Sequence, residues 1–244
     1  MGLSNLSAQE TKKKTDTDAA GLKGQVKSVK SISYYAVLKS RKIAKGNVYS
    51  NEEYLYNADG NRIEWNSYNV NGRLSNKRTY KYNSDGNLIE ESVYNSNGAL
   101  ESKYTHKYDS NGNWTEAKSY KSDGSLDEEY TFKYVYKGNR TEWNWYKSNG
   151  SLAHKTIYNS KGNRIEWNSY NSNGSLSHKN MYDAKGNLIE TNNYNSDGSL
   201  KYKHTYDYKY DSKGNWIEQI EYVKGLKSAK KAEKITERTI TYYK

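Results

Sequence analysis

The sequence predicts an all-β protein in which repeated β-hairpins form an antiparallel meander, one long coiled or superhelical sheet. Two observations predict this class: a motif that recurs along the chain, and glycine-containing turn signals at even spacing. Gly60–Asn69 returns unchanged at Gly162–Asn171, and Gly138–Lys147 is a close copy. Self-similarity of this kind is typical of repeat proteins.

The turn signals divide the chain into strands. Each ends in a glycine, as in Asn69-Val-Asn-Gly72, and a leading Asx with a final residue at positive φ suits a type I turn with a G1 bulge. The intervening segments are rich in Tyr, Ile, Trp and Thr, as strands are. Some sixteen strands are expected, enough for the sheet to curl. The turn glycines are Gly60, Gly72, Gly86, Gly98, Gly112, Gly124, Gly138, Gly150, Gly162, Gly174, Gly186, Gly198 and Gly214.

Aromatic rings supply most of the material for a core. Leu, Ile, Val and Phe number 34 of 244 residues, a fraction typical of disordered chains. Tyr, Trp and Phe also number 34, and they recur at fixed spacing, so amphipathic rings provide the apolar area that folding needs. We therefore expect an ordered protein with a thin core.

The turn type also predicts the register of the hairpins. A G1-bulge turn that ends at Gly72 places Tyr68 opposite Leu74, and the same rule applies to five further hairpins. A register one residue off would pair Glu64 with Lys77, but exposed ion pairs contribute less than aromatic–aliphatic pairs, so we choose the first. The six expected pairs are Tyr68–Leu74, Tyr94–Leu100, Tyr120–Leu126, Tyr146–Leu152, Tyr170–Leu176 and Tyr194–Leu200.

In this register the sheet has two different faces. One face collects most of the tyrosines and leucines, together with Trp114, and is expected to be the inner, packed face. The other is semi-polar and is expected to be wet; a lysine stem can cover an indole there. It carries Trp65 opposite Lys77, Trp143 opposite Lys155 and Trp167 opposite Lys179, and Trp145 shares it.

The termini differ from the repeats. We expect a disordered leader over 1–20, N-terminal capping strands over 21–56, hairpin repeats over 57–216 and C-terminal capping strands over 217–244. The net charge of +11 lies on the termini: residues 51–219 carry 22 positive and 22 negative side chains. A nucleic-acid-binding body would carry a basic stripe, so no nucleic acid is expected.

Several other classes of function are not supported. No stretch approaches the roughly 20 apolar residues of a membrane helix, so membrane insertion is not expected. There is no cysteine, which excludes disulfides and thiolate zinc sites. The turn clusters resemble calcium loops only faintly, because Lys185 and Lys213 occupy their centres. We expect no metal site and no cofactor.

The sequence also lacks a recognisable catalytic motif. There is no nucleophile elbow, P-loop or dinucleotide fingerprint, and the chain is expected not to be an enzyme. A glutamate recurs once per repeat and is interpreted as a structural ladder, and the histidines are interpreted as polar fillers. The glutamates are Glu64, Glu90, Glu116, Glu142, Glu166, Glu190 and Glu218, and the histidines are His106, His154, His178 and His204.

Three segments resemble the YD (Tyr-Asp) repeats of RHS-type bacterial proteins: Tyr80–Ile89, His106–Asn113 and Tyr208–Ile217. The resemblance spans about residues 54–222. It implies β-hairpins wound into a spiral shell and a secreted or cell-surface setting, in the envelope of a bacterium. Two features depart from the family: the chain is too short to enclose a toxin domain, and its hairpin pairs repeat every 24 to 26 residues. No catalytic residues transfer from the family.

Regularly spaced aromatic rings on a sheet suggest ligand binding. Rings flanked by Asn, Ser, Lys and Glu suit stacking on sugar faces with hydrogen bonds to hydroxyls. The first hypothesis is a non-enzymatic protein that binds a polysaccharide or cell-wall glycan. The expected ligand-binding residues are Trp65, Trp143, Trp145, Trp167, Lys77, Lys155 and Lys179. Two alternatives stay open: the tryptophans only shield the sheet, or the chain is a protein–protein scaffold or adhesin-like module, with a protein partner bound at edge strands or the basic termini.

Overall fold

The chain folds into a single antiparallel sheet of sixteen strands in sequence order, which confirms the predicted all-β meander of hairpins. The computed structural model describes residues 15–244 except 111–113, 138–139, 148 and 226–228. The strands are β1 (Val26–Lys39), β2 (Lys42–Tyr56), β3 (Arg62–Tyr68), β4 (Leu74–Tyr82), β5 (Leu88–Asn95), β6 (Leu100–Tyr108), β7 (Trp114–Lys121), β8 (Leu126–Lys137), β9 (Arg140–Tyr146), β10 (Leu152–Tyr158), β11 (Arg164–Tyr170), β12 (Leu176–Tyr182), β13 (Leu188–Tyr194), β14 (Leu200–Tyr210), β15 (Trp216–Gly225) and β16 (Lys231–Tyr242).

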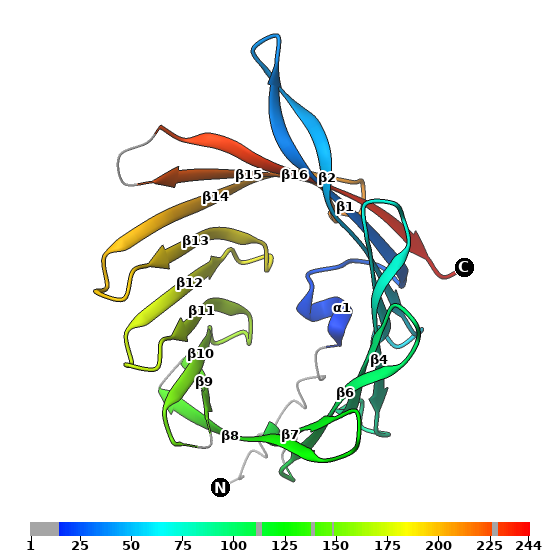
Figure 1. The fold of residues 1–244 in the computed structure, drawn as a ribbon, viewed down its shortest axis with the longest axis vertical. Helices are drawn as coiled ribbons and strands as arrows, with labels where there is room; N and C mark the ends of the chain where they lie inside the picture. The colour runs from blue at the N-terminus through cyan, green and yellow to red at the C-terminus, as the bar shows by residue number, and fades with distance from the viewer. Residues whose placement is uncertain (1–14, 111–113, 138–139, 148, 226–228) are drawn as a thin grey trace, which may run out of the picture.

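The sheet curls until its first and last strands meet. β1 pairs with β2 on one side and with β16 on the other, in a register that places Val29 opposite Ile240. The strand order is therefore that of a closed barrel, and Figure 1 shows the strands arranged in a ring. Each strand has a hydrogen-bonded neighbour on both sides, so the open edge strands that a scaffold could have used are not present among the described strands.

The hairpin turns have the geometry that the sequence predicts. At the β3–β4 turn, the amide of Gly72 donates to the carbonyl of Asn69 at 2.9 Å, and Gly72 has a φ of +76°. The Asn69 side chain accepts from the amides of Asn71 and Arg73, which fixes the loop. The predicted turns at Gly112 and Gly138 lie outside the described residues.

The register chosen from the sequence forms at each turn, whereas the alternative does not, because Glu64 lies opposite Thr79 and not opposite Lys77. All six expected Tyr–Leu pairs form, Tyr68–Leu74 among them. The register then shifts by one residue, so that Asn66, and not Trp65, lies opposite Lys77. The shift also brings Lys77 Nζ within 2.6 Å of Glu64. A bulge beside each turn therefore satisfies the aromatic–aliphatic pair and the ion pair together.

Contacts between strands that are not neighbours identify the concave inner face. The Trp114 ring of β7 stacks on Trp143 of β9 at 5.6 Å between centroids, although β8 lies between these strands. Arg238 of β16 likewise lies near Tyr54 of β2 and Tyr208 of β14, with one strand between on either side. Only on a concave face do side chains of non-adjacent strands converge. The tryptophans therefore face inward.

The predicted composition of the two sheet faces is therefore wrong. The tryptophan face, expected to be the wet outer surface, lines the inside of the ring. The tyrosines, expected on one packed face, are divided between both: Tyr68 shares the face of Glu64, whereas Tyr80 lies opposite Glu91 on the face of Trp65. The bulges cause the division, because each moves the residues beyond it to the opposite face.

A short helix contacts the turns at one end of the ring. Helix α1 (Asp16–Ala19) begins with a capping box between Thr15 and Asp18 and lies inside the ring in Figure 1. The Asp16 carboxylate accepts from the Arg62 amide at 2.8 Å and from the Tyr82 hydroxyl at 2.7 Å. Residues 15–20 were expected to be part of a disordered leader, which is wrong; residues 1–14 lie outside the described residues.

The core is small and lies where the N-terminal segment meets the sheet. Leu22, Val26, Val29 and Tyr56 form one buried cluster, packed by Tyr54, Ile240 and Tyr242. It joins the two predicted capping regions directly. Among the described residues, no helix combines the length and apolarity needed to cross a membrane.

Candidate functional site

The inner face carries a continuous row of aromatic rings. The rings come from β6, β7, β9, β10 and β11, and each ring contacts the next. The contacts are His106–Trp114 at 4.9 Å, Trp114–Trp143 at 5.6 Å, Trp143–Trp145 at 6.3 Å, Trp145–His154 at 4.8 Å and His154–Trp167 at 5.1 Å between ring centroids. We call these six residues the aromatic row.

The two histidines of the aromatic row are held in the neutral form. Burial lowers the pKa of His106 to about 4, and burial followed by repulsion from Lys147 lowers the pKa of His154. Within the described residues, both ring nitrogens of His106 and Nδ1 of His154 are buried without a hydrogen-bond partner. A neutral imidazole can donate one hydrogen bond and accept another, so these buried nitrogens have unused hydrogen-bonding capacity.

Small polar side chains flank the row and continue it toward β14. Thr156 lies opposite both Trp143 and Trp167 and is 3% exposed. Beyond Trp167, Thr191 donates to Asn180 at 2.8 Å and accepts from the Tyr206 hydroxyl at 3.1 Å. The inner face therefore combines flat apolar rings with hydroxyl and amide groups, which is the composition of a site for a polar ligand with apolar faces.

The structure separates the lysines of the predicted site from its tryptophans. Lys155 follows His154 on β10, so its side chain points to the outer face. There its ammonium lies 3.2 Å from Glu142, while Lys77 pairs with Glu64 and Lys179 with Glu166. The predicted Trp–Lys contacts are wrong, because the bulge displaces the register by one residue.

Trp65 lies on the inner face but outside the aromatic row. Its ring contacts the guanidinium of Arg78 at 5.4 Å, and Arg78 in turn pairs with Glu91. Of the seven predicted ligand-binding residues, the structure therefore brings together only Trp143, Trp145 and Trp167. Sequence reasoning missed His106, Trp114 and His154, because the assumed register placed them on the opposite face.

The outer face carries a belt of ion pairs that follows the repeat. The predicted glutamate ladder is present there, and each glutamate pairs with a lysine of an adjacent strand, which is the preceding strand for Glu116 and Glu218 and the following strand for the others. Besides the three pairs already given, the belt contains Lys103–Glu90 at 2.6 Å, Lys203–Glu190 at 2.5 Å, Lys107–Glu116 at 2.9 Å and Lys209–Glu218 at 2.7 Å. This arrangement is structural, because the carboxylates are paired and identical from repeat to repeat.

The N-terminal segment borders a cavity of about 960 Å³ at one end of the ring. Thr15, Thr17 and Asp18 line one side, and the turns that contain Gly60 and Gly86 line the other. The segment is fastened by Asn215, which accepts from the Lys23 amide at 2.6 Å and donates to the Lys23 carbonyl at 3.1 Å. The N-terminal segment of the chain therefore narrows the space at this end of the ring.

Comparison with known proteins finds only distant structural likeness. No protein-family model and no curated protein matches the sequence. The structure is similar to a porin-like protein from Bacteroides uniformis, with a TM-score of 0.45 and 12% identity over 88% of this chain and 96% of that one. A porin-like protein from Bacteroides vulgatus gives a TM-score of 0.42 and 13% identity over 89% and 98%. S. aureus TarM gives 0.27 and 12% over 42% of this chain and 19% of that one, so the chain spans about a fifth of TarM's length.

Proposed function

We propose that the protein is a non-enzymatic, secreted or cell-surface bacterial protein that binds a polysaccharide or cell-wall glycan along the aromatic row. The observation that carries the proposal is the row itself: six rings in mutual contact on a concave face. Aromatic rings stack on the apolar faces of sugars, and adjacent rings offer several such stacking positions along one ligand. The setting is the one that the resemblance to RHS-type repeats implies.

The dimensions of the ring are consistent with an internal ligand. Barrels of eight strands are filled by their own side chains, whereas barrels of about sixteen strands leave an interior wide enough for water and solutes. The indoles of Trp143, Trp145 and Trp167 are only partly buried, so part of each ring is accessible. Successive rings would each contribute a weak contact to one glycan chain, with the affinity arising from their number.

Retention on insoluble polysaccharides and peptidoglycan, at about 0.15 and 0.5 M salt, tests the proposal because salt screens charge but not stacking. A triple alanine variant of Trp143, Trp145 and Trp167 is expected to lose retention at both salt concentrations. The matched control replaces Lys77, Lys155 and Lys179 by alanine, three side chains of the outer face. Retention lost in the lysine variant but kept in the tryptophan variant would contradict stacking on the row.

A protein partner is the second candidate, and one observation favours it. The hairpin of β1 and β2 extends beyond the ring in Figure 1 and carries Leu38, which is 77% exposed, with Val37 and Ile43 beside it. An exposed apolar tip is a common feature of binding surfaces. If this candidate is correct, one defined protein is captured by the wild-type chain and lost with Leu38→Ser, while binding to sugars is absent.

A further inference from the structure

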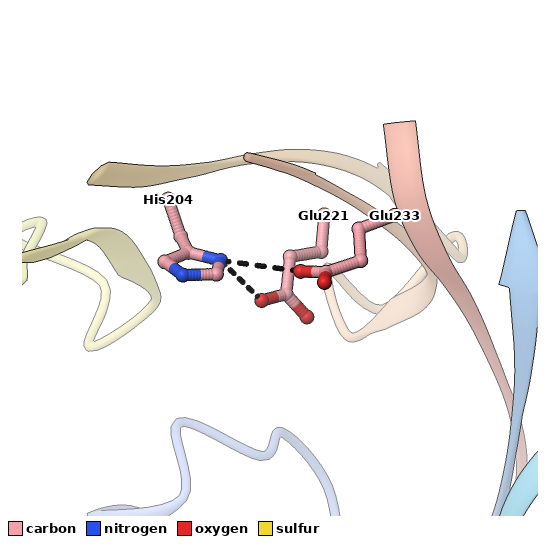
Figure 2. A group of neighbouring side chains, drawn as sticks. All are labelled: His204, Glu221 and Glu233. Carbon is pink, nitrogen blue, oxygen red and sulfur yellow. Dashed lines mark ion pairs between the residues drawn. The ribbon is translucent and has the colours of Figure 1, made fainter. Parts of the chain in front are cut away.

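Three acid–base side chains converge on the inner face at β14, β15 and β16, several strands away from the aromatic row. His204 Nδ1 lies 2.8 Å from Glu221 Oε1 and 3.5 Å from Glu233 Oε2. Figure 2 shows the three side chains pointing toward one another from three different strands. Their ligand atoms all lie within 4.8 Å of one another.

A β-bulge creates this group. Glu221 lies opposite Lys234, and the next pair is Tyr222 with Ala232, so Glu233 is the extra residue on β16. A bulge redirects the side chain of its extra residue, which here brings Glu233 to the side of Glu221. His204 is the diagonal neighbour of Glu221, because His204 lies opposite Val223. Glu221 and Glu233 lie beyond the predicted hairpin repeats, on β15 and β16.

The group is partly buried, and its hydrogen bonding is incomplete. The side chains of His204 and Glu221 are 15% and 14% exposed, and Glu233 is 37% exposed. Among the described residues, His204 Nδ1 and Glu233 Oε2 are buried atoms without a hydrogen-bond partner of acceptable geometry. Two carboxylates held this close repel each other unless a cation lies between them, and buried polar atoms without partners are rare in folded proteins.

We propose that His204, Glu221 and Glu233 bind a divalent first-row transition-metal ion. Imidazole nitrogen and carboxylate oxygen bind Zn²⁺ at about 2.0–2.2 Å, which places ligand atoms of one ion roughly 3–4 Å apart. The present separations therefore require only small side-chain rotations. Three protein ligands leave a fourth coordination position for water or a solute. Mg²⁺ and Ca²⁺ prefer all-oxygen sites and are expected to bind far more weakly.

Lys234 is the resident cation that the metal ion would replace. Its ammonium lies 3.4 Å from Glu221 Oε2 and also 4.6 Å from the centre of the Tyr49 ring. Burial raises the pKa of Glu221, but His204 and Lys234 outweigh it, so this pKa lies below its ordinary value and the carboxylate is ionised. When Glu221 turns to the metal ion, Lys234 keeps its contact with Tyr49. The ammonium nevertheless opposes binding by charge repulsion.

Isothermal titration of the chelator-treated full chain with ZnCl₂ tests this inference, which does not rest on the proposed glycan binding. One ion per chain is expected, with affinity at least about tenfold lower in His204→Ala, Glu221→Gln and Glu233→Gln. His154→Ala is the matched control, because it removes a buried histidine of the aromatic row and is expected to leave Zn²⁺ affinity unchanged. Circular dichroism verifies that each variant folds.

Lys234→Met gives a test that loss of folding cannot mimic. Removal of the competing ammonium is expected to tighten Zn²⁺ binding by about tenfold. Visible absorption of bound Co²⁺, present in the wild-type chain and absent in His204→Ala, identifies the imidazole as a ligand. The proposal is overturned if neither the wild-type chain nor Lys234→Met binds Zn²⁺ saturably, or if His204→Ala binds Zn²⁺ as tightly as the wild-type chain. In either case the three side chains form an ion pair only.

Discussion

At the scale of single residues, burial on the inner face decides the chemistry of the polar side chains. His106 lies against Trp114 and carries no charge at neutral pH, because burial disfavours the imidazolium. On the outer face the same kind of β-strand carries lysines and glutamates that remain charged and paired. One strand therefore presents an uncharged, ring-lined surface on one side and a charged belt on the other.

His106 is expected to make the fold sensitive to acid. Its pKa is about 4 in the folded chain, against about 6.5 when unfolded, so between these values the unfolded state takes up a proton that the folded state does not. Stability is then lost as the pH falls from about 6.5 toward 4, by about 1–2 kcal/mol after a discount for partial exposure. Urea unfolding at pH 7 and pH 4.5 measures the loss. His106→Gln is expected to reduce this loss of stability, whereas Thr105→Ala on the outer face is expected to leave it unchanged. Equal losses of stability in the two variants would show that His106 is not its source.

Asn215 is expected to be the residue on which docking of the N-terminal segment depends most. Its side chain is 1% exposed, and its amide binds both the N–H and the carbonyl of Lys23 and the Tyr242 hydroxyl. Asn215→Ala leaves buried backbone groups without partners and is expected to cost about 2 kcal/mol in urea unfolding. Limited proteolysis is expected to cleave residues 15–24 faster. Asn187→Ala serves as control, because Asn187 holds the equivalent repeat position but its amide donates to Asp183 and Tyr210. Equal effects of the two substitutions would show that docking of the N-terminal segment does not depend on Asn215.

At the scale of elements, the hairpins were predictable because their determinants are local. An Asx residue and the glycine that closes the same four-residue turn fix the turn, and the turn fixes the first pair of each hairpin, as in Tyr68–Leu74. The register beyond that pair was not predictable. Sequence reasoning assumed one register along the whole hairpin, whereas a bulge shifts it beyond the first pair, so that Lys77 lies opposite Asn66 and meets Glu64 diagonally. For that reason Trp143 and Trp167 were assigned correctly to one face, while Lys155 and Lys179 were not.

Two equivalent turn glycines are expected to differ in their tolerance of alanine. Gly98 has a φ of +79°, and a methyl group added there would meet no other atom within 4 Å, so Gly98→Ala is expected to cost only backbone strain. That strain is about 1–2 kcal/mol. Gly60 has a φ of +87°, and an added Cβ would collide with Thr15 and Thr17. Gly60→Ala is therefore expected to cost clearly more and to displace α1. Urea unfolding of both variants tests this; equal costs would show that α1 contributes nothing at this turn.

At the scale of the whole molecule, closure of the ring was not predictable from the repeats. It depends on β1 and β16, which lie about 200 residues apart in the chain and have no repeat signature. The sequence predicted them as capping segments of the repeat array and left open whether the sheet closes. Their pairing joins the two ends of the sheet and produces an inner face, which is the reason that the tryptophans line an interior. The proposed function thus depends on a contact that no local pattern indicates.

An engineered disulfide is expected to report closure, because the chain has no cysteine of its own. Lys30 and Thr239 lie directly opposite each other in the β1–β16 pair, within the range that a disulfide spans. Lys30→Cys with Thr239→Cys is expected to oxidise readily, as judged by faster migration on a non-reducing gel. Lys30→Cys with Glu237→Cys, two residues out of register, is the control. Equal oxidation of both pairs, or of neither, would contradict the closed strand order.

Two consecutive residues can show whether the inner face, and not the outer one, binds a glycan. His154 belongs to the aromatic row, whereas Lys155 points to the outer face. The measurement is isothermal titration of wild-type chain, His154→Ala and Lys155→Ala with a soluble oligosaccharide of a polysaccharide that retains the wild-type chain. We expect affinity about tenfold lower for His154→Ala and unchanged for Lys155→Ala. Unchanged affinity for His154→Ala with a loss for Lys155→Ala would contradict glycan binding on the inner face.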